Sequence, residues 1–342
     1  MALRRGRGAR VRSPPVEQRV LGRTGRPVSV IGLGTWQLGA DWGNVTDSEA
    51  LAVLHAAVES GVTFLDTADV YGDGRSECII GRFRASDAGQ GLTVATKMGR
   101  RVAQVPASYT LENFRAWTDR SRANLGVDTL DLVQLHCPPT PVYSSDATYD
   151  ALDTLVSEGR IAAYGVSVET CEEALAAIAR PGTATVQIIL NAFRRKPLDE
   201  VLPAAVAAGV GIIARVPLAS GLLSGRYTKD SAFPADDHRN FNRHGEAFDV
   251  GETFSGVDFE TGVDAAREFA ALALPGATPA QTALRWVIQQ PGVTTVIPGA
   301  RNPDQARQNA HVPGLPPLDQ RSLDAIEDLY DKYFRAQVHS RW

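Results

Sequence analysis

Two kinds of hydrophobic pattern alternate along the chain, and together they predict its secondary structure. Short apolar runs rich in β-branched residues predict eight strands, at residues 28–35, 62–68, 92–98, 130–137, 162–168, 185–191, 211–217 and 294–300. Longer stretches with apolar positions every three or four residues predict helices, at residues 46–61, 110–124, 146–158, 170–179, 198–208, 278–289 and 303–311. In the first helix, Thr46 and Glu49 have the spacing of a capping box, and Gly61 suits a C-cap.

The alternation of strands with helices predicts a parallel sheet whose crossover connections are the helices. The strands are continuously apolar, as expected when both faces of a sheet are covered. Eight such units favour a closed (β/α)8 TIM barrel over an open sheet.

Three segments fall outside the repeating unit. Residues 16–31 contain a Gly-Arg-Thr-Gly turn, and we expect a short hairpin there before the barrel. Residues 219–262 form a long loop after the seventh strand, and loops of that length are usually functional or disordered. Residues 318–336 predict an extra C-terminal helix. We therefore expect a single barrel domain over residues 16–342.

The start of the chain differs in composition from the rest. Residues 1–15 are rich in Arg, Gly and Pro and contain no acidic residue. This composition is typical of a disordered leader. A transit peptide is the alternative, but Gly and Pro disfavour the amphipathic helix that such a peptide forms.

The composition of the whole chain excludes several classes of function. At 342 residues, 44% hydrophobic and 22% charged, it is that of a globular protein. A net charge of −4 provides no basic field for nucleic acid, and no apolar run approaches the roughly 20 residues that span a bilayer. The three cysteines, Cys78, Cys137 and Cys171, lack CxxC spacing, which favours a reducing cytoplasm over a disulfide scaffold.

Four residues of complementary chemistry fall near the ends of predicted strands. Asp66 lies late in the second strand, Lys97 late in the third and His136 late in the fourth, while Tyr71 follows the second strand. The carboxyl ends of barrel strands meet at one mouth, where active sites of this fold lie. We therefore expect the four side chains to converge, with Lys97 neutralising the buried carboxylate of Asp66.

This combination of residues suits proton transfer to an oxygen. A free tyrosine has a pKa of about 10, and a nearby ammonium lowers it by favouring the phenolate. A carboxylate behind the lysine keeps the lysine charged, and a histidine beside the tyrosine orients a substrate oxygen. Carbonyl reduction needs such an acid and also a hydride, so a nicotinamide cofactor is implied and no metal is expected.

From about residue 17 to residue 335, the chain resembles the aldo-keto reductase family. The motifs occur in the family's order: GLGTWQLG, FLDTADVYGDGRSE, VATKMG, DLVQLHCP, GRIAAYGVS, VQIILNAF, ARVPLASGLLSGRY and VIPGARNPDQARQN. The resemblance implies reduction of an aldehyde or ketone with NADPH as cofactor, and NADH is the alternative. It implies that Tyr71 donates the proton, that Lys97 and Asp66 tune the pKa of Tyr71, and that His136 orients the carbonyl.

The resemblance also implies which residues hold the nicotinamide end of the cofactor. Thr35 and Trp36 match the turn beside the ribose, and Ser167 and Gln187 match the residues that hold the carboxamide. Where the family commonly has a stacking aromatic, this chain has Arg215. A cation beside a ring that becomes positive on oxidation should favour the reduced cofactor. The family's usual Asn after the serine is also replaced, here by Val168.

The other end of the cofactor is implied in the same way. Residues 217–226 resemble the loop over the pyrophosphate, with Arg226 as a countercharge, and Arg301 suits a 2′-phosphate. A lysine that the family often carries near Arg301 is absent, and Gly299 occupies the strand-end position. The complete set of cofactor residues implied by the resemblance is Thr35, Trp36, Asp66, Ser167, Gln187, Arg215, Val216, Pro217, Leu218, Gly221, Leu223, Gly225, Arg226, Gly299, Arg301, Gln305, Gln308 and Asn309.

Simpler interpretations apply to several other residues. GLGTWQLG is not a dinucleotide-binding glycine loop, because Gln37 breaks the pattern and no helix follows directly. Cys137 should face away from His136 and pack in the core. His238 and His244 suit a solvated loop better than a metal site. Glu77 is expected to be a surface or helix-start charge.

Some questions stay open at this level. Six aromatic residues either line a substrate pocket or pack in the core: Trp42, Tyr143, Phe193, Phe241, Phe248 and Phe254. They suggest an apolar or aromatic-tolerant pocket.

One rival function is a regulatory or redox-sensor protein that only binds the cofactor, as potassium-channel β-subunits do. Another is a tailoring reductase for a keto-sugar or enone, and the oligomeric state is undetermined.

Overall fold

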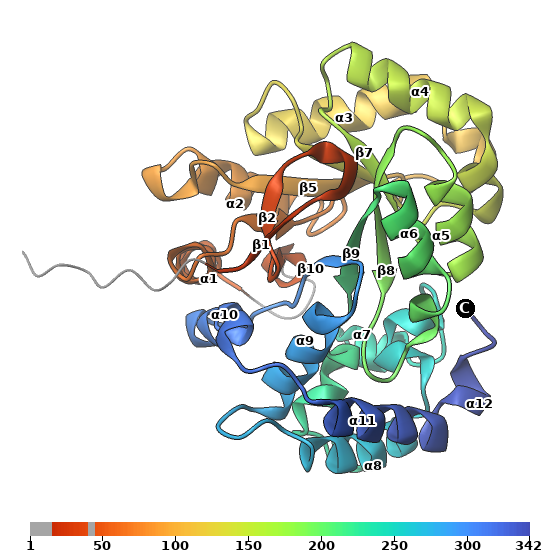
Figure 1. Cartoon of the computed structure of the whole chain (residues 1–342). Helices are drawn as coiled ribbons and strands as arrows, with labels where there is room; N and C mark the ends of the chain where they lie inside the picture. The colour runs from red at the N-terminus through yellow and green to blue at the C-terminus, as the bar shows by residue number, and fades with distance from the viewer. Residues whose placement is uncertain (1–15, 40–44) are drawn as a thin grey trace, which may run out of the picture.

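The computed structural model describes residues 16–39 and 45–342 (Figure 1). The expectations for residues 1–15 and for Trp42 therefore lie outside the described residues. Eight strands form one parallel sheet: β3 (Leu33–Gly34), β4 (Phe64–Asp66), β5 (Thr93–Met98), β6 (Leu132–His136), β7 (Tyr164–Ser167), β8 (Thr183–Ile189), β9 (Gly211–Arg215) and β10 (Val293–Val296). Bridges from Ile31 to Val296 and from Gly34 to Gly299 join the first and last strands. The predicted (β/α)8 barrel is confirmed.

The helices surround the strands, with their bounds close to those predicted. They are α1 (Asp47–Glu59), α2 (Arg75–Arg84), α3 (Leu111–Leu125), α4 (Asp146–Ser157), α5 (Cys171–Ile178), α6 (Val201–Ala208), α7 (His238–Phe241), α8 (Phe259–Ala270), α9 (Pro279–Gln289), α10 (Pro303–Ala310), α11 (Gln320–Tyr333) and α12 (Arg335–Val338). The Thr46–Glu49 capping box is present, with Thr46 N donating to Glu49 Oε2 at 2.8 Å. The sequence patterns did not predict α2, α7 and α8.

The first predicted strand was partly wrong. Residues 16–31 do form a hairpin, in which β1 (Gln18–Val20) pairs antiparallel with β2 (Pro27–Ser29). The run 28–35 therefore begins in this hairpin, and only the short β3 belongs to the barrel. Val28 and Leu21 are apolar because they pack with the interior barrel residues Phe64 and Leu132. The hairpin thus plugs one end of the barrel.

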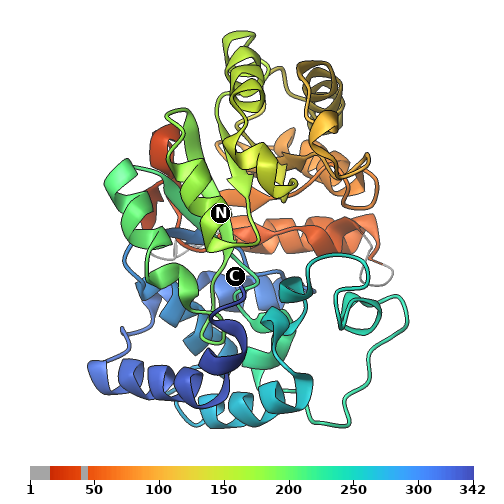
Figure 2. The same cartoon turned by 90° about the vertical axis from the view of Figure 1, so that its right-hand side faces the viewer.

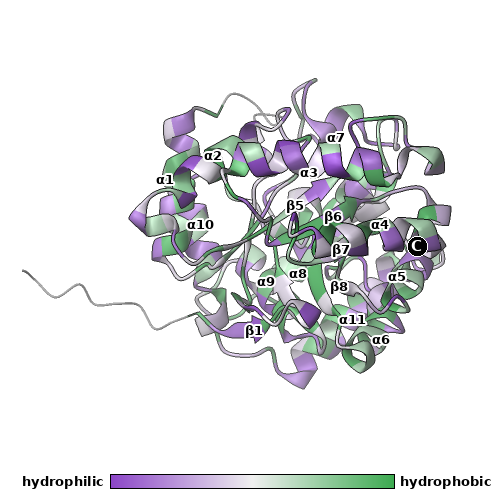
Figure 3. Ribbon diagram, turned by 90° about the horizontal axis from the view of Figure 1, so that it is seen from above, coloured by the Kyte–Doolittle hydropathy of each residue, from purple (hydrophilic) through white to green (hydrophobic). Residues whose placement is uncertain are grey.

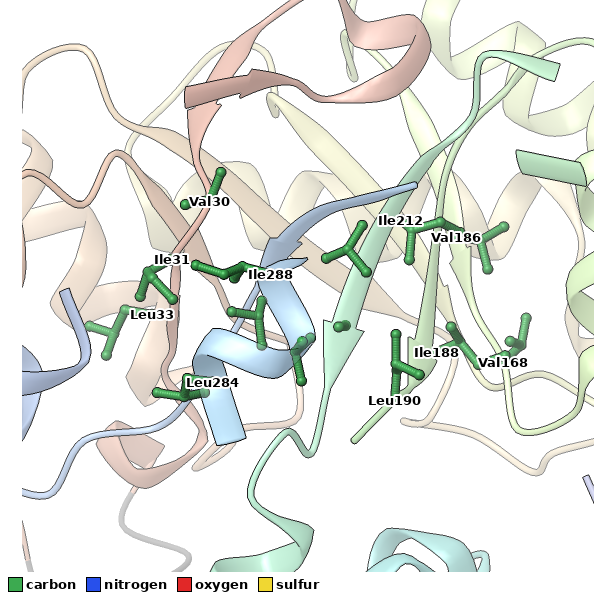
Figure 4. Packing of buried hydrophobic residues seen from close by; sticks show 14 of the residues in the cluster. Val30, Ile31, Leu33, Val168, Val186, Ile188, Leu190, Ile212, Leu284 and Ile288 are labelled. Atoms are coloured by element: carbon green, nitrogen blue, oxygen red, sulfur yellow. The ribbon is translucent and has the colours of Figure 1, made fainter. Parts of the chain in front are cut away.

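Most of the hydrophobic core lies between the strands and the ring of helices. Seen from above, hydrophobic residues gather on the strands and purple, hydrophilic residues on outer helix surfaces (Figure 3). In Figure 4, Val186 and Ile212 lie beside each other, in agreement with their pairing in the β8–β9 register, and Leu284 and Ile288 project from α9. All four side chains are at most 1% exposed. This layer fixes the positions of the strand ends.

The segment after β9 is long and mostly irregular, as predicted. Figure 2 shows it running out to one side of the barrel before α8. Since α8 begins at Phe259, the predicted loop over 219–262 ends earlier than expected. Trp342 holds this insertion in place, because its indole Nε1 donates to Asp249 Oδ1 at 3.2 Å and its ring stacks on Arg194. The predicted C-terminal helix is confirmed as α11 and α12, split at Phe334.

Within the described ranges 16–39 and 45–342, every helix is too short or too polar to cross a membrane.

The hairpin plug depends on one arginine. The guanidinium of Arg23 donates to the carbonyl oxygens of Arg180, Pro181, Thr183 and Ala208, at distances between 2.6 and 3.0 Å. We expect Arg23→Met to lower the free energy of unfolding by about 2 kcal/mol, because four carbonyls lose a charged donor. Urea denaturation measures the change. Arg321→Met, at an exposed position of α11, is the control, and an equal effect of both substitutions would contradict this role for Arg23.

Candidate active site

The four residues of the predicted constellation lie together at the carboxyl end of the barrel. Lys97 Nζ lies 2.5 Å from Asp66 Oδ1 and 3.4 Å from the Tyr71 hydroxyl, and it donates to the Thr67 carbonyl at 2.9 Å. The Tyr71 and His136 rings meet edge to face, with centroids 6.0 Å apart. The structure therefore brings a carboxylate, an ammonium, a phenol and an imidazole into one site.

Strand alternation explains why these side chains point inward. Successive residues of a strand face opposite sides of the sheet, so residues two apart share a face. Phe64 lies two residues before Asp66, and Leu132 lies four residues before His136. Both of these apolar residues belong to the cluster inside the barrel. The interior is thus apolar near the hairpin and becomes polar at the opposite end, where the chemistry can take place.

A residue that the sequence interpretation missed completes the environment of Asp66. Gln134 Nε2 donates to Asp66 Oδ2 at 3.1 Å, and Gln187 Nε2 donates to the same oxygen at 2.8 Å. Gln134 lies two residues before His136 in β6, so the alternation rule could have placed it inside the barrel. Gln187, which the resemblance assigned to the carboxamide, also supports the carboxylate of Asp66.

The pKa of Tyr71 is raised, whereas the sequence predicted that Lys97 would lower it. Burial raises the pKa of Tyr71, and the opposing effect of Lys97 does not cancel it. The negative charges of Asp66 and Glu252 add to the effect of burial on the Tyr71 pKa. Burial alone lowers the pKa of Lys97, but Asp66 and Tyr71 outweigh it and keep the lysine charged. Burial, and then Arg100, lower the pKa of His136 well below its ordinary value, so the imidazole is neutral.

A cavity of about 540 Å³ opens directly over these groups. It extends from Tyr71 and His136 to α10, and most of the implied cofactor residues line it: Thr35, Trp36, Asp66, Ser167, Gln187, Arg215, Val216, Pro217, Leu218, Gly221, Arg226, Gly299, Arg301, Gln305, Gln308 and Asn309. Leu223 and Gly225 are not part of the wall. Leu223 is fully buried, and Gly225 ends a 3-10 turn with φ 69°.

The far end of the cavity is suited to phosphate groups. Arg226 and Arg301 both line it, and no carboxylate among the described residues forms an ion pair with either guanidinium. The loop after β9 also lines the cavity and turns sharply, with left-handed φ values of 52° at Val216, 54° at Ser220 and 98° at Gly221. A left-handed φ is strained for valine, and such strain concentrates at ligand sites. The charge and shape of this end fit a dinucleotide.

Beside the near end lies a largely buried cluster of charges that the sequence interpretation missed, of which Arg215 and Glu252 line the cavity. We call Arg100, Glu169, Arg215 and Glu252 the charge cluster. Arg215 Nη2 donates to Glu169 Oε2 at 2.8 Å, and Arg100 Nη2 donates to Glu252 Oε1 at 3.0 Å. Arg215 Nη1 lies 3.7 Å from the same Glu252 oxygen. Arg215 is therefore not the lone cation that the sequence suggested, because two carboxylates lie against it.

The prediction that Cys137 packs in the core, facing away from His136, is wrong. Cys137 is half-buried and lines the cavity together with His136, because β6 ends at His136 and the strand alternation ends with it. Cys137 lies against Ser167 and Arg215, and burial raises the pKa of its thiol to about 12. The ligand atoms of Cys137, Glu169 and Glu252 lie within 4.8 Å of one another. A metal ion there would have to displace guanidinium groups that already neutralise both carboxylates.

The expectation for one of the two histidines of the insertion was wrong: His244 is exposed as expected, but His238 is not. His238 is 2% exposed and lies in the cavity wall beside Trp36, with ring centroids 5.2 Å apart, so it is not a solvated loop residue. Burial lowers its pKa to about 4. Five of the candidate aromatics do not line the cavity: Tyr143, Phe193, Phe241, Phe248 and Phe254. Tyr143, Phe193 and Phe254 are core residues, at most 1% exposed.

The family of the chain can now be stated. The sequence model described as the Aldo/keto reductase family matches residues 30–331. The chain belongs to this family. The aldo-keto reductase YhdN of Bacillus subtilis is 29% identical over 311 residues, which cover 89% of this chain and 91% of that protein. A probable voltage-gated potassium channel subunit beta of Arabidopsis thaliana is 30% identical over 336 residues, which cover 90% of this chain and 95% of that protein.

Solved structures show the same barrel. The glycerol dehydrogenase AKR11B4 from Gluconobacter oxydans has a TM-score of 0.74 and 31% identity, covering 90% of this chain and 93% of that one. An aldo-keto reductase from Klebsiella pneumoniae, in complex with NADPH, has a TM-score of 0.68 and 26% identity, covering 92% of this chain and 95% of that one. The resemblance inferred from the motifs is thereby confirmed.

Two acidic residues beside the site have unexpected environments. Glu77 is fully buried, not at the surface, and accepts hydrogen bonds from Thr96 Oγ1 at 2.6 Å and Asn124 Nδ2 at 2.8 Å. Asp69 is also fully buried, and neither of its carboxylate oxygens has a hydrogen-bond partner among the described residues. Burial, with a further contribution from Glu77, raises the pKa of Asp69 to about 7.

Asp69 should therefore make the stability of the protein depend on pH. Its pKa rises from 3.8 in the unfolded chain to about 7 in the folded one, so stability falls as the pH rises through that window. We expect Asp69→Asn to stabilise the protein by about 2 kcal/mol more at about pH 8 than at about pH 5. Thermal unfolding at both pH values tests this. Asp230→Asn, at an exposed position, is the control, and a pH-independent effect of Asp69→Asn would contradict the prediction.

Proposed function

We propose that this member of the aldo/keto reductase family is an NADPH-dependent enzyme that reduces an aldehyde or ketone to an alcohol. The observation that carries the proposal is the contact of Tyr71 with Lys97 and His136 under a cavity whose other end contains unpaired guanidinium groups. The neighbour in complex with NADPH supports the choice of cofactor.

Each residue of the site has a separate role in transferring the proton to the carbonyl oxygen. Tyr71 is the proton donor, and its hydroxyl lies 3.4 Å from Lys97 Nζ, so the ammonium stabilises the phenolate that forms. Asp66 keeps Lys97 charged and oriented. His136 is neutral and lines the cavity beside Tyr71, so its ring can orient the carbonyl oxygen through a hydrogen bond. Bound NADPH supplies the hydride.

The cavity provides a place for each part of the cofactor. Ser167, Gln187 and Arg215 would hold the nicotinamide, because they line the cavity next to the catalytic groups. The strained loop after β9 and Arg226 would hold the pyrophosphate. Arg301 would pair with the 2′-phosphate, and α10 would contact the adenine through Gln308 and Asn309. This arrangement uses every unpaired charge at the far end.

The wall near Tyr71 favours a small substrate with hydroxyl groups. The polar or charged side chains of His238 and Glu252 line the cavity together with Trp36, so this wall is less apolar than the sequence suggested. Such groups bind a ligand that forms hydrogen bonds with them more tightly than a purely apolar ligand, which would leave them unsatisfied. The similarity to a glycerol dehydrogenase supports this class of substrate.

A second candidate function is that of a regulatory protein that only binds the cofactor. The relative named as a potassium channel subunit beta favours it, because its identity to this chain is as high as that of the aldo-keto reductase relative. Steady turnover of an aldehyde by the purified protein would exclude it.

Tyr71→Phe tests the proton donor. We expect kcat for a small aldehyde to fall at least about 100-fold, while the Kd for NADPH changes less than about twofold, since only the acid is lost. Stopped-flow kinetics and fluorescence titration measure the two quantities. Tyr333→Phe removes an exposed tyrosine hydroxyl and should leave both unchanged. Normal turnover in Tyr71→Phe would show that another group supplies the proton.

Arg301→Ala tests the choice of nucleotide. We expect the Kd for NADPH to rise roughly tenfold to a hundredfold, because a charged hydrogen bond to the 2′-phosphate is lost. The Kd for NADH should change less than about twofold. Arg307→Ala is the matched control, since Arg307 lies on α10, which begins two residues after Arg301, but pairs with Asp304. Equal weakening of both nucleotides by Arg301→Ala would place the 2′-phosphate elsewhere.

A further inference from the structure

Arg215 presents an electrostatic problem for the proposed reaction. Its side chain is 9% exposed and lines the cavity together with Ser167 and Gln187. The nicotinamide of NADPH is neutral, whereas that of NADP+ has a positive charge. Like charges repel strongly in a buried site, where the effective dielectric constant is far below that of water. An uncompensated guanidinium would therefore weaken the binding of NADP+ relative to NADPH.

The charge cluster supplies the compensation from separate parts of the chain. Glu169 follows β7 and accepts from Arg215 at 2.8 Å. Glu252 comes from the long insertion and lies between the two guanidiniums, 3.0 Å from Arg100 and 3.7 Å from Arg215. Arg100 is anchored on its other side, because its Nε donates to the His136 carbonyl. With both glutamates ionised, the four charges sum to zero.

The two carboxylates of the charge cluster differ in how strongly their surroundings favour the ionised form. Although burial raises the pKa of Glu252, Arg100 and Arg215 outweigh burial and hold the pKa at about 2. Burial raises the pKa of Glu169 to about 7 despite Arg215. Glu252 is therefore ionised throughout the neutral range, and Glu169 joins it above about pH 7.

We propose that Glu252, together with Glu169, is a positioning residue that balances the charge of Arg215 and allows the site to hold the oxidised cofactor. The proposal rests on the proposed function, because it requires the nicotinamide to bind beside Arg215. It gives the insertion a specific role, which is to deliver a carboxylate to the cofactor side of the cavity. Glu252 is also fixed there by its backbone, since its carbonyl accepts from Ser220 Oγ at 3.1 Å.

The test compares the affinities of the two redox forms. At about pH 8, we expect Glu252→Gln to raise the ratio of the Kd for NADP+ to the Kd for NADPH by roughly threefold to thirtyfold. Calorimetric titration of each nucleotide gives this ratio without turnover. Glu246→Gln is the matched control, because Glu246 is an exposed glutamate of the same insertion. Its ratio should equal that of the wild type.

Further variants separate charge balance from a general loosening of the insertion. Arg215→Gln should lower the ratio, and combining it with Glu252→Gln should bring the ratio back toward the wild-type value. If Glu252→Gln fails to fold, Glu169→Gln replaces it with the same expected direction. Equal weakening of NADP+ and NADPH by Glu252→Gln, or an unchanged ratio, would overturn the proposal while leaving the proposed function intact. If the wild type binds neither nucleotide, the proposed function fails, and this inference fails with it.

Discussion

The buried ion pair between Asp66 and Lys97 is the interaction on which the site depends. Both side chains are at most 3% exposed, and removing two such charges from water costs more than their attraction returns unless further hydrogen bonds satisfy them. Gln134, Gln187 and the Thr67 carbonyl supply those bonds. The pair itself joins β4 to β5, and its partners come from β6, β8 and the residue after β4, so it is satisfied only when these strands are in register. The register of the barrel strands and the assembly of the site therefore depend on each other.

The sequence predicted the barrel well because its strands are buried on both faces and therefore stand out as apolar runs. The strand prediction was wrong where a residue is apolar although it lies outside the barrel strands. Val28 belongs to a plug and not to a barrel strand, so the first strand began too early. Helix α2 was missed because it follows a glycine-rich turn and contains four charged residues in RSECIIGRFR. Its Glu77 looks like a surface charge, yet tertiary contacts with Thr96 and Asn124 bury it.

Some residues of the candidate site could likewise be predicted from the sequence, and others could not. Asp66, Lys97 and His136 could be placed from the sequence because each lies near the end of a strand, and barrel topology brings strand ends together. Gln134 could have been placed by the same reasoning. Glu252 could not be placed in this way, because no periodic pattern connects the insertion to the barrel. Its position depends on distant contacts, such as that of Trp342 with Asp249, which only the folded chain reveals.

The charge cluster also restricts how this enzyme can evolve. Its four members come from four segments, and a substitution that removes one charge leaves an opposite charge buried without compensation. Neutral drift at one of these positions therefore requires a matching change at another, most simply the loss of one arginine together with one glutamate. Homologues should accordingly show these positions changing in pairs. The length of the insertion should vary together with these positions. In a chain without Glu252, the insertion no longer has to bring a carboxylate to the barrel mouth.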